Sequence, residues 1–345
     1  MTLQEVSWLV DEPTYRADPA LSYSNISTYE SLGFSGLDHL FDRKETPSLT
    51  FGSMVDTYIT DGPEAYENRY LVADIPVLSD QMNEILTNLL ILCGSRWQRF
   101  EDIPKDEVVN ACTMAKYGMT WRADTRYSKV VDAKVGDIYD IKASLTDKEL
   151  VSTEMHNDCM ATVNALKTSD ATKWYFQANN SFDEWERFYQ LKFKATLNGI
   201  DYRCMADLLM VNKSIRKIIP CDLKTGSVPE WEFPNNFIKW HYQLQARSYP
   251  RVIKEALKGT EYEGYTWENY RFIYVNKKTL TPLVWTFPYT YNKGRLIVAD
   301  NIFEDPEVLG AELYNYLQNK PAVPTDIKLT QPNDIAAWLS RHCKK

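Results

Sequence analysis

Two aspartates and a lysine stand on two consecutive strand-like segments of this chain. Asp207 lies within one apolar run, and Asp222 directly follows a second apolar run at 218–221. Lys224 comes two residues after Asp222. Because side chains i and i+2 of a strand share a face, Asp222 and Lys224 are expected to project together while Leu223 points into the core. Carboxylates that share a divalent cation beside an ammonium group are suited to metal-assisted phosphodiester hydrolysis.

Two further groups of residues have the spacing of a site. Gln245 and Tyr249 are four residues apart within a predicted helix over 236–258, so they are expected to lie on one helix face. Gly52 and Asp56 have the same spacing at the expected start of another helix. An aspartate there could ligate a metal, or it could be an ordinary charge on a helix surface.

In this order these residues resemble a known superfamily. The pattern resembles the PD-(D/E)XK nucleases, and within them the RecB-like and RecE-like phage exonucleases of the exodeoxyribonuclease VIII type. The resemblance covers about residues 20–60 and 180–290, and it rests on these segments: Gly52-x-x-x-Asp56, Asp207, Asp222-x-Lys224-Thr225-Gly226 and Gln245-x-x-x-Tyr249. It implies an α/β fold with a restriction-endonuclease-like core, in which a central mixed β-sheet is flanked by helices and carries a helical insertion.

The resemblance also assigns roles at a metal site. It implies that Asp207, Asp222 and the backbone carbonyl of Leu223 bind Mg²⁺ or Mn²⁺. Asp56 stands where the family usually has a histidine ligand, so either it replaces that ligand or the role is taken elsewhere. Lys224 would orient or deprotonate the attacking water and offset charge in the transition state.

Three more residues receive roles from the same resemblance. Gln245 and Tyr249 would line the active site and contact the DNA backbone. Glu186 precedes a predicted hairpin where related nucleases often place a glutamate near the metal. Glu184 is equally well placed, and a plain charged residue at a strand start is an equal alternative for Glu186.

Hydrophobic patterning predicts how the chain is organised. We expect a single nuclease domain over 1–345, with its core at about 20–60 and 170–320 and a helical insertion at about 61–170. Within the insertion, Thr146-x-x-Glu149 is a candidate capping box for the helix that follows. In the core, Asn198-Gly199 predicts a hairpin turn after an alternating strand. Further expected elements are helices over 80–100, 105–118 and 306–320 and strands within 270–288.

Composition narrows the class of protein. The chain has 345 residues, of which 44% are hydrophobic and 25% charged, as expected for a packed soluble globule. It has no apolar run of about 18 residues, so a membrane span is not expected. Six cysteines without a C-x-x-C pair indicate reduced thiols of a cytosolic protein. The net charge of −8 weighs mildly against a phosphate-binding surface, although a local groove can still be basic.

These observations predict a metal-dependent deoxyribonuclease. By resemblance it would be an end-dependent double-strand DNA exonuclease of phage recombination type. Its expected partners are double-stranded DNA with free ends, a single-strand annealing protein and other copies of itself in a homo-oligomer, in the cytoplasm of a bacterial host. An endonuclease or nickase on the same core, and a DNA-binding protein with a degenerate nuclease core, are the alternatives.

Overall fold

The chain divides into two compact units. One unit comprises Met1–Thr60 with Cys159–Lys345, and the other comprises Asp61–Asp158. The computed structural model describes residues 1–33, 37, 40–41, 46–74, 78–144, 148–179 and 183–319. The arrangement with one nuclease domain and an insertion at 61–170 stays a prediction, and the boundary between the units falls at Asp158. In the described ranges no helix is long and apolar enough to span a membrane.

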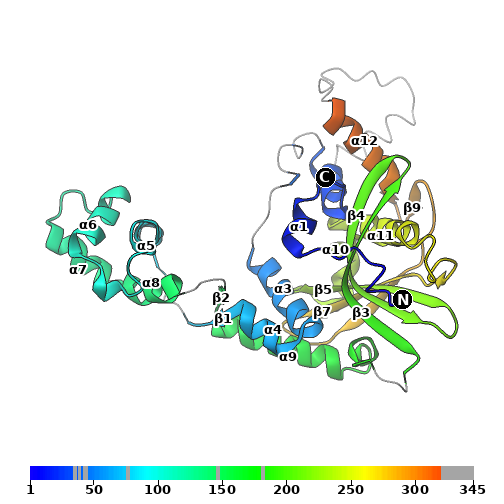
Figure 1. Ribbon diagram of the computed structural model, residues 1–345, viewed down its shortest axis with the longest axis horizontal. Coiled ribbons are helices and arrows are strands. Elements are labelled where there is room, and N and C mark those ends of the chain that lie inside the picture. The colour runs from blue at the N-terminus through cyan, green and yellow to red at the C-terminus, as the bar shows by residue number, and fades with distance from the viewer. Residues whose placement is uncertain are drawn as a thin grey trace. The chain divides into compact units, whose positions relative to one another are not determined.

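A central mixed β-sheet organises the larger unit (Figure 1). The strand order is β3–β4–β5–β7–β8, and β6 pairs with β5 off this path. β5 runs parallel to β6 and β7, whereas the other neighbours are antiparallel. The strands are β3 Trp185–Leu197, β4 Ile200–Asn212, β5 Lys217–Gly226, β6 Thr266–Trp267, β7 Tyr270–Asn276 and β8 Leu283–Phe287. A separate antiparallel pair is formed by β9 Leu296–Val298 and β10 Asn301–Phe303.

The β3–β4 hairpin forms as predicted. Asn198 and Gly199 both have positive φ, 52° and 81°, which is the backbone that a tight two-residue hairpin loop requires. The turn fixes the pairing register, which continues through β4 into β5. The strands expected within 270–288 are also present as β7 and β8.

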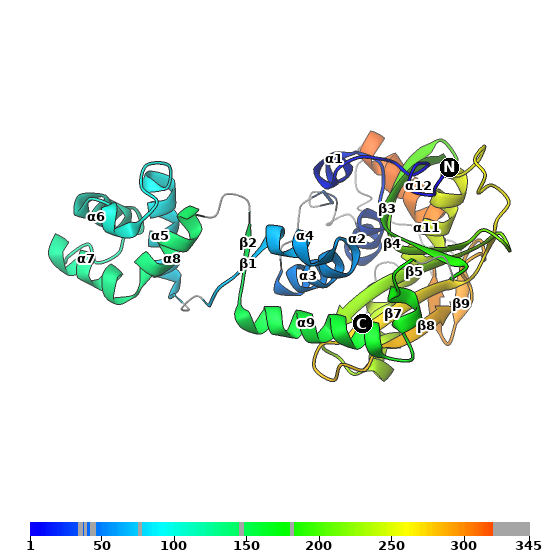
Figure 2. The ribbon, with the colours of Figure 1, turned by 60° about the horizontal axis from the view of Figure 1, so that its bottom comes forward.

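Helices flank the sheet. Helix α11 (Tyr242–Ala256) packs against β3 and β4, and helices α2 (Tyr23–Leu32) and α12 (Pro306–Asn319) pack against α11 (Figure 2). Helix α3 (Pro47–Thr60) lies beside β5, and it begins five residues earlier than the glycine expected to start it. The remaining short helices of this unit are α1 Glu12–Ala17, η3 Lys173–Phe176, η4 Glu230–Glu232 and α10 Phe233–Lys239.

The single helix predicted over 236–258 is wrong. The structure has two helices, α10 and α11, separated by Trp240 and His241. His241 has φ 54°, in the left-handed region, so helical hydrogen bonding cannot continue through it. Hydrophobic periodicity does not reveal this break, because apolar residues occur on both sides of it.

The smaller unit contains a helical core of its own. Four helices share one buried cluster that includes Ile85, Leu89 and Tyr139. They are α5 Asp80–Cys93, α6 Lys105–Met114, α7 Ala123–Asp132 and α8 Val135–Ser144, with the 3-10 turn η2 Phe100–Asp102 between α5 and α6. The unit also holds α4 Gly62–Arg69 and the parallel strands β1 Tyr70–Val72 and β2 Glu149–Val151.

The capping box predicted around Glu149 is wrong. Thr146 lies outside the described residues, and Glu149 opens strand β2, where it pairs with Tyr70 of β1. Helix α9 (Thr153–Thr168) begins only after this strand. The boundary between the two units, at Asp158 and Cys159, falls within the sequence of this helix.

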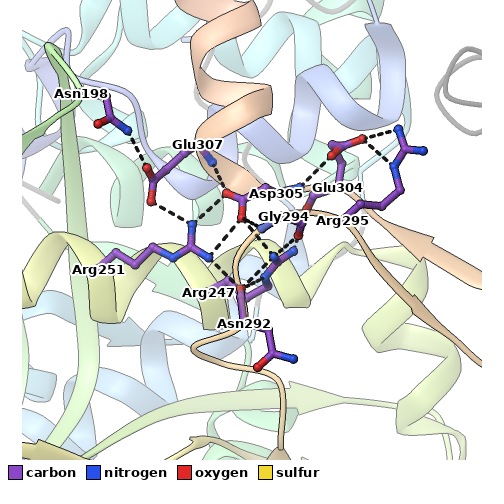
Figure 3. A network of polar contacts seen from close by, with 9 residues as sticks. All are labelled: Asn198, Arg247, Arg251, Asn292, Gly294, Arg295, Glu304, Asp305 and Glu307. Carbon is purple, nitrogen blue, oxygen red and sulfur yellow. Dashed lines mark hydrogen bonds and ion pairs between the residues drawn. The ribbon is translucent and has the colours of Figure 1, made fainter. Parts of the chain in front are cut away.

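A buried arginine on α11 ties the helix to the chain that follows the sheet (Figure 3). The Arg247 side chain is fully buried and ion-pairs with Asp305 at 3.1 Å. Its guanidinium also donates to the backbone carbonyls of Asn292, Gly294 and Glu304. Arg251, one turn further along, pairs with the same Asp305 at 2.8 Å. These contacts fix the rotation of α11 about its axis.

We expect Arg247→Met to lower the free energy of unfolding by about 3 kcal/mol, because it leaves buried carbonyls without a donor and breaks a buried ion pair. The measurement is urea unfolding followed by circular dichroism. Arg16→Met is the matched control, since Arg16 is 59% exposed in its pair with Glu12 and should change little. Equal losses for both variants would contradict a structural role for the Arg247 contacts.

Candidate active site

The predicted acid and lysine of β5 form an ion pair. Lys224 Nζ lies 2.6 Å from Asp222 Oδ2, which shows that the two side chains project together as expected. Asp222 is 1% exposed, whereas the Lys224 side chain is 21% exposed. A charged carboxylate this deeply buried requires compensation, and Lys224 supplies it. The expectation for Leu223 is wrong in one respect: it is half-buried and lines a cavity instead of entering the core.

Asp207 and Asp222 come next on their strands where the β4–β5 ladder ends. Its last pair is Leu208 with Cys221, and the two aspartates follow this pair without being a ladder pair themselves. Asp207 Oδ2 accepts the backbone N–H of Leu223 at 3.0 Å. Where the strands stop pairing, the Asp207 carboxylate accepts the Leu223 N–H that would otherwise lack a partner. The same hydrogen bond holds the Asp207 side chain in place.

Helix α11 completes the polar cluster with Gln245. Its amide nitrogen donates to Asp222 Oδ1, and its amide oxygen accepts from Lys224 Nζ at 3.2 Å. Gln245 is 3% exposed. One amide therefore bridges both members of the ion pair and holds them in place from the helix side.

A small cavity gathers the three predicted carboxylates. Asp56, Asp207 and Asp222 all line it, and Leu223 contributes to its wall. Asp56 reaches it from α3, which lies beside β5. The other lining residues are Ile59, Thr60, Phe176, Tyr189, Gln190, Leu208 and Ile273. All of them belong to the larger unit.

The electrostatics of this cavity are those of crowded acids. Burial raises the pKa of Asp207 well above its ordinary value, and the carboxylates of Asp222 and Asp56 raise it further. Lys224 and the Leu223 N–H act in the opposite direction but do not outweigh these effects. Ionising Asp207 in this cavity therefore has a cost in folding free energy.

Lys224 remains a cation in this setting. Burial lowers the pKa of its ammonium, but Asp222, Tyr242 and Asp207 raise it by more, so the net shift is upward. The ammonium also lies 4.8 Å from the ring centroid of Tyr242. A group held in its charged form is suited to stabilising or orienting an anion, and less suited to removing a proton from water.

The donor set is compatible with a hard divalent cation. Asp207, Asp222 and Asp56 offer carboxylate oxygens, the ligands that Mg²⁺ prefers, and a cation would relieve their mutual repulsion. Among the described residues no three His, Cys, Asp or Glu side chains converge tightly enough to form a complete ligand set. A bound ion would therefore also need backbone oxygen, water or substrate oxygen.

Two residues assigned by the resemblance lie apart from the cluster. Glu186 pairs with Lys213 at 3.4 Å near the start of β3 and is absent from the cavity wall. Tyr249 packs half-buried among core residues, with its ring 6.4 Å from that of Tyr23. Burial raises the pKa of Tyr249 well above its ordinary value, and the neighbouring Tyr15 and Cys204 raise it further.

Gln190 is a cavity residue that the sequence pattern did not reveal. The β3–β4 ladder pairs Tyr189 with Leu208 and Leu191 with Ala206, but it omits the intervening pair of Gln190 and Asp207. Gln190 has φ 50°, a conformation rarely adopted by residues other than glycine and often found at functional sites. Gln190, Asp207 and Asp222 thus line the same cavity from three neighbouring strands. An alternating strand pattern gives no signal for such a local distortion.

Comparisons with known proteins give little further information. No protein-family model matches the chain, and no curated protein matches its sequence. Among solved structures, it is similar to a "Putative exonuclease" from Eubacterium rectale, with 10% identity and a TM-score of 0.41. That alignment covers 98% of this chain and 94% of the other. Similarity at this level assigns neither a family nor a function to this chain.

We expect Asp207→Asn to stabilise the metal-free protein at pH 7, because it removes one of the crowded charges while the amide oxygen can still accept the Leu223 N–H. A carboxyl whose pKa is raised on folding binds more protons in the native state than in the unfolded state. Its penalty is therefore present above the folded pKa and disappears as the pH falls toward the unfolded value near 4. The stability difference between variant and wild type should shrink in the same way.

The measurement is thermal unfolding in EDTA from pH 4 to pH 8. Asp201→Asn on the same strand is the control, because Asp201 is exposed and bonded to Thr196. A destabilised Asp207→Asn protein at pH 7 would contradict the crowding of charges described above.

Proposed function

We propose that this chain is a metal-dependent deoxyribonuclease with a PD-(D/E)XK core, acting on double-stranded DNA from a free end. The observation that carries the proposal is the group of side chains at the end of the β4–β5 ladder. Asp207 and Asp222 are the next residues on the two strands there, both line one cavity, and Lys224 ion-pairs with the second acid. Two acids on neighbouring strands with a lysine two residues after the second is the arrangement for which the motif is named.

The chain's own residues divide the work at this site. Asp207 and Asp222, with the Leu223 carbonyl, would hold Mg²⁺ or Mn²⁺, which when bound polarises a phosphate oxygen and lowers the pKa of water. Lys224 presents a positive charge to the scissile phosphate or to the water that attacks it. Gln245 keeps Lys224 and Asp222 in register through its two hydrogen bonds.

Asp56 is the remaining candidate ligand in this proposal. It lines the same cavity as the two strand acids, which supports a ligand role over that of a plain helix-surface charge. An aspartate in place of the usual histidine makes all the side-chain ligands hard oxygen donors. Such a set favours Mg²⁺ over softer divalent ions.

End dependence, the homo-oligomer and an annealing partner come from the resemblance to RecE-like exonucleases. We include them in the proposal because the Gly52–Asp56 helix and the Gln245–Tyr249 helix are both present as helices next to the strand motif. The carboxylates that line the cavity support phosphodiester hydrolysis. A preference for DNA ends is tested by comparing linear with circular plasmid.

We expect the wild-type protein with Mg²⁺ to degrade linear plasmid and to leave covalently closed circular plasmid intact. Lys224→Ala should lower the rate at least about 100-fold, as is usual when a charge-stabilising group is removed from an active site. Lys217→Ala is the matched control. Lys217 lies on the same strand, but its Nζ pairs with Glu268 at 2.7 Å and the residue does not line the cavity. The readout is gel electrophoresis over time.

Each other outcome of this assay has a definite meaning. Cleavage of both plasmids would replace the exonuclease with an endonuclease on the same core. Absence of cleavage in both Mg²⁺ and Mn²⁺ would favour a DNA-binding protein with a degenerate site.

A second prediction concerns Asp56. If it is a ligand, Asp56→Ala should raise the Mg²⁺ concentration needed for half-maximal cleavage by about tenfold or more, as is typical on loss of a metal contact. Isothermal titration with Mg²⁺ gives an independent reading on the metal alone. Wild-type metal affinity and activity in this variant, matching an Asp201→Asn control, would rule out the ligand role.

A further inference from the structure

The segment that leads from β5 to α11 exposes large aromatic side chains. Trp231 in η4 is 70% exposed, and Trp240, directly after α10, is 50% exposed. Ile238 between them is 37% exposed. Most large aromatic residues of this unit are buried in its clusters, so two tryptophans in solvent on one short segment are unusual.

The backbone of Trp240 is anchored by hydrogen bonds although its side chain is exposed. Its backbone carbonyl accepts the Tyr23 hydroxyl at 2.6 Å and the Ser27 hydroxyl at 3.3 Å, both from α2. The next residue, His241, is in the left-handed region with φ 54°. A backbone anchored by two hydroxyls restricts where the indole can lie, and this lowers the entropy cost of binding a ligand there.

The same junction lies beside the catalytic lysine of the proposed reaction. Tyr242, two residues after Trp240, has its ring centroid 4.8 Å from Lys224 Nζ. Phe233, at the start of α10, stacks on Tyr242 with ring centroids 6.0 Å apart and planes at 26°. α10 is therefore packed onto the residue that contacts Lys224, and Trp240 connects the two helices.

Positive charge accompanies the exposed ring. Lys239 Nζ lies 4.8 Å from the centroid of the Trp240 ring. An aromatic face next to an ammonium group matches a ligand that has flat rings joined by phosphates.

Trp231 is also presented by an anchored segment. The neighbouring Glu230 is 4% exposed and accepts hydrogen bonds from Thr279 and Thr281. The carbonyl of Val228 accepts from the Tyr274 hydroxyl at 2.9 Å and from the Asn276 amide at 2.8 Å. The turn is thus tied to β7 and to the loop after it, while the Trp231 side chain stays in solvent.

From these contacts we infer that Trp240, assisted by Trp231, stacks on unpaired bases of the DNA strand and positions that strand beside Lys224. This inference rests on the proposed function and adds a positioning residue to it. A second copy of this chain could also cover an exposed indole. The lysine next to the ring and the junction's place beside the site favour nucleic acid, because stacking on bases is tolerant of sequence and tracks a charged backbone.

The test measures DNA binding without cleavage. The parent protein is Lys224→Ala in EDTA, and the probe is a fluorescein-labelled duplex that ends in three unpaired thymidines. A second probe carries abasic residues at those three positions. We expect Trp240→Ala to weaken binding of the first probe about 10- to 100-fold. Binding of the abasic probe should be nearly unchanged by the same substitution.

Two further variants make the result specific. Trp240→Phe keeps a flat ring and should retain most of the affinity. Trp121→Ala removes an indole that is 43% exposed in the smaller unit, and it should have no effect. Circular dichroism of each variant checks that the fold is intact.

The inference is overturned by any of three results: no loss on Trp240→Ala, an equal loss with the abasic probe, or no binding by the parent. A concentration-dependent oligomer that Trp240→Ala dissociates without changing DNA affinity would identify a second copy as the occupant instead. Because cleavage is not measured, the two ideas fail separately. A protein that stacks on bases but does not cut loses only the nuclease proposal, and one that cuts without dependence on Trp240 loses only this inference.

Discussion

The arrangement of this protein depends on the place where β4 and β5 stop pairing. Up to Leu208 and Cys221 the strands satisfy each other's backbone groups, and beyond that point the Asp207 carboxylate takes the Leu223 N–H instead. At the same place the half-buried Asp207 and the buried Asp222 line one cavity. Crowded charge in a low-dielectric site is unfavourable, so it requires compensating groups such as Lys224 and Gln245.

The surrounding elements can be understood as compensation. Lys224 neutralises Asp222, and Gln245 bridges the two from α11. α11 can serve this purpose only if its rotation is fixed, and the buried Arg247 fixes it through Asp305 and three backbone carbonyls. The strained backbone of Gln190 opposite Asp207 fits the same picture, in which local strain is retained where the site requires it.

Two exposed tryptophans stand on the segment between β5 and α11. Trp240 and Trp231 both keep a large part of the indole ring in water. The Trp240 carbonyl accepts the Tyr23 hydroxyl, and the Val228 carbonyl, three residues before Trp231, accepts the Tyr274 hydroxyl. Rigid backbone with an exposed ring is the combination expected of a binding surface, because the ordering cost has already been met during folding. The acidic net charge of −8 is compatible with such a surface when a lysine, here Lys239, stands next to the ring.

The sequence alone determined the local elements and the chemistry of the strand motif. Alternation and Asn198-Gly199 predicted the β3–β4 hairpin, and the i, i+2 spacing predicted the Asp222–Lys224 pair, because both depend only on neighbours in the chain. Tertiary structure decided what depends on distant partners. Glu149 pairs with Tyr70 in a strand, and the predicted helix is interrupted at His241. Glu186 pairs with Lys213, and Asp56 and Gln190 line one cavity. No local pattern encodes these contacts, since each is set by long-range packing.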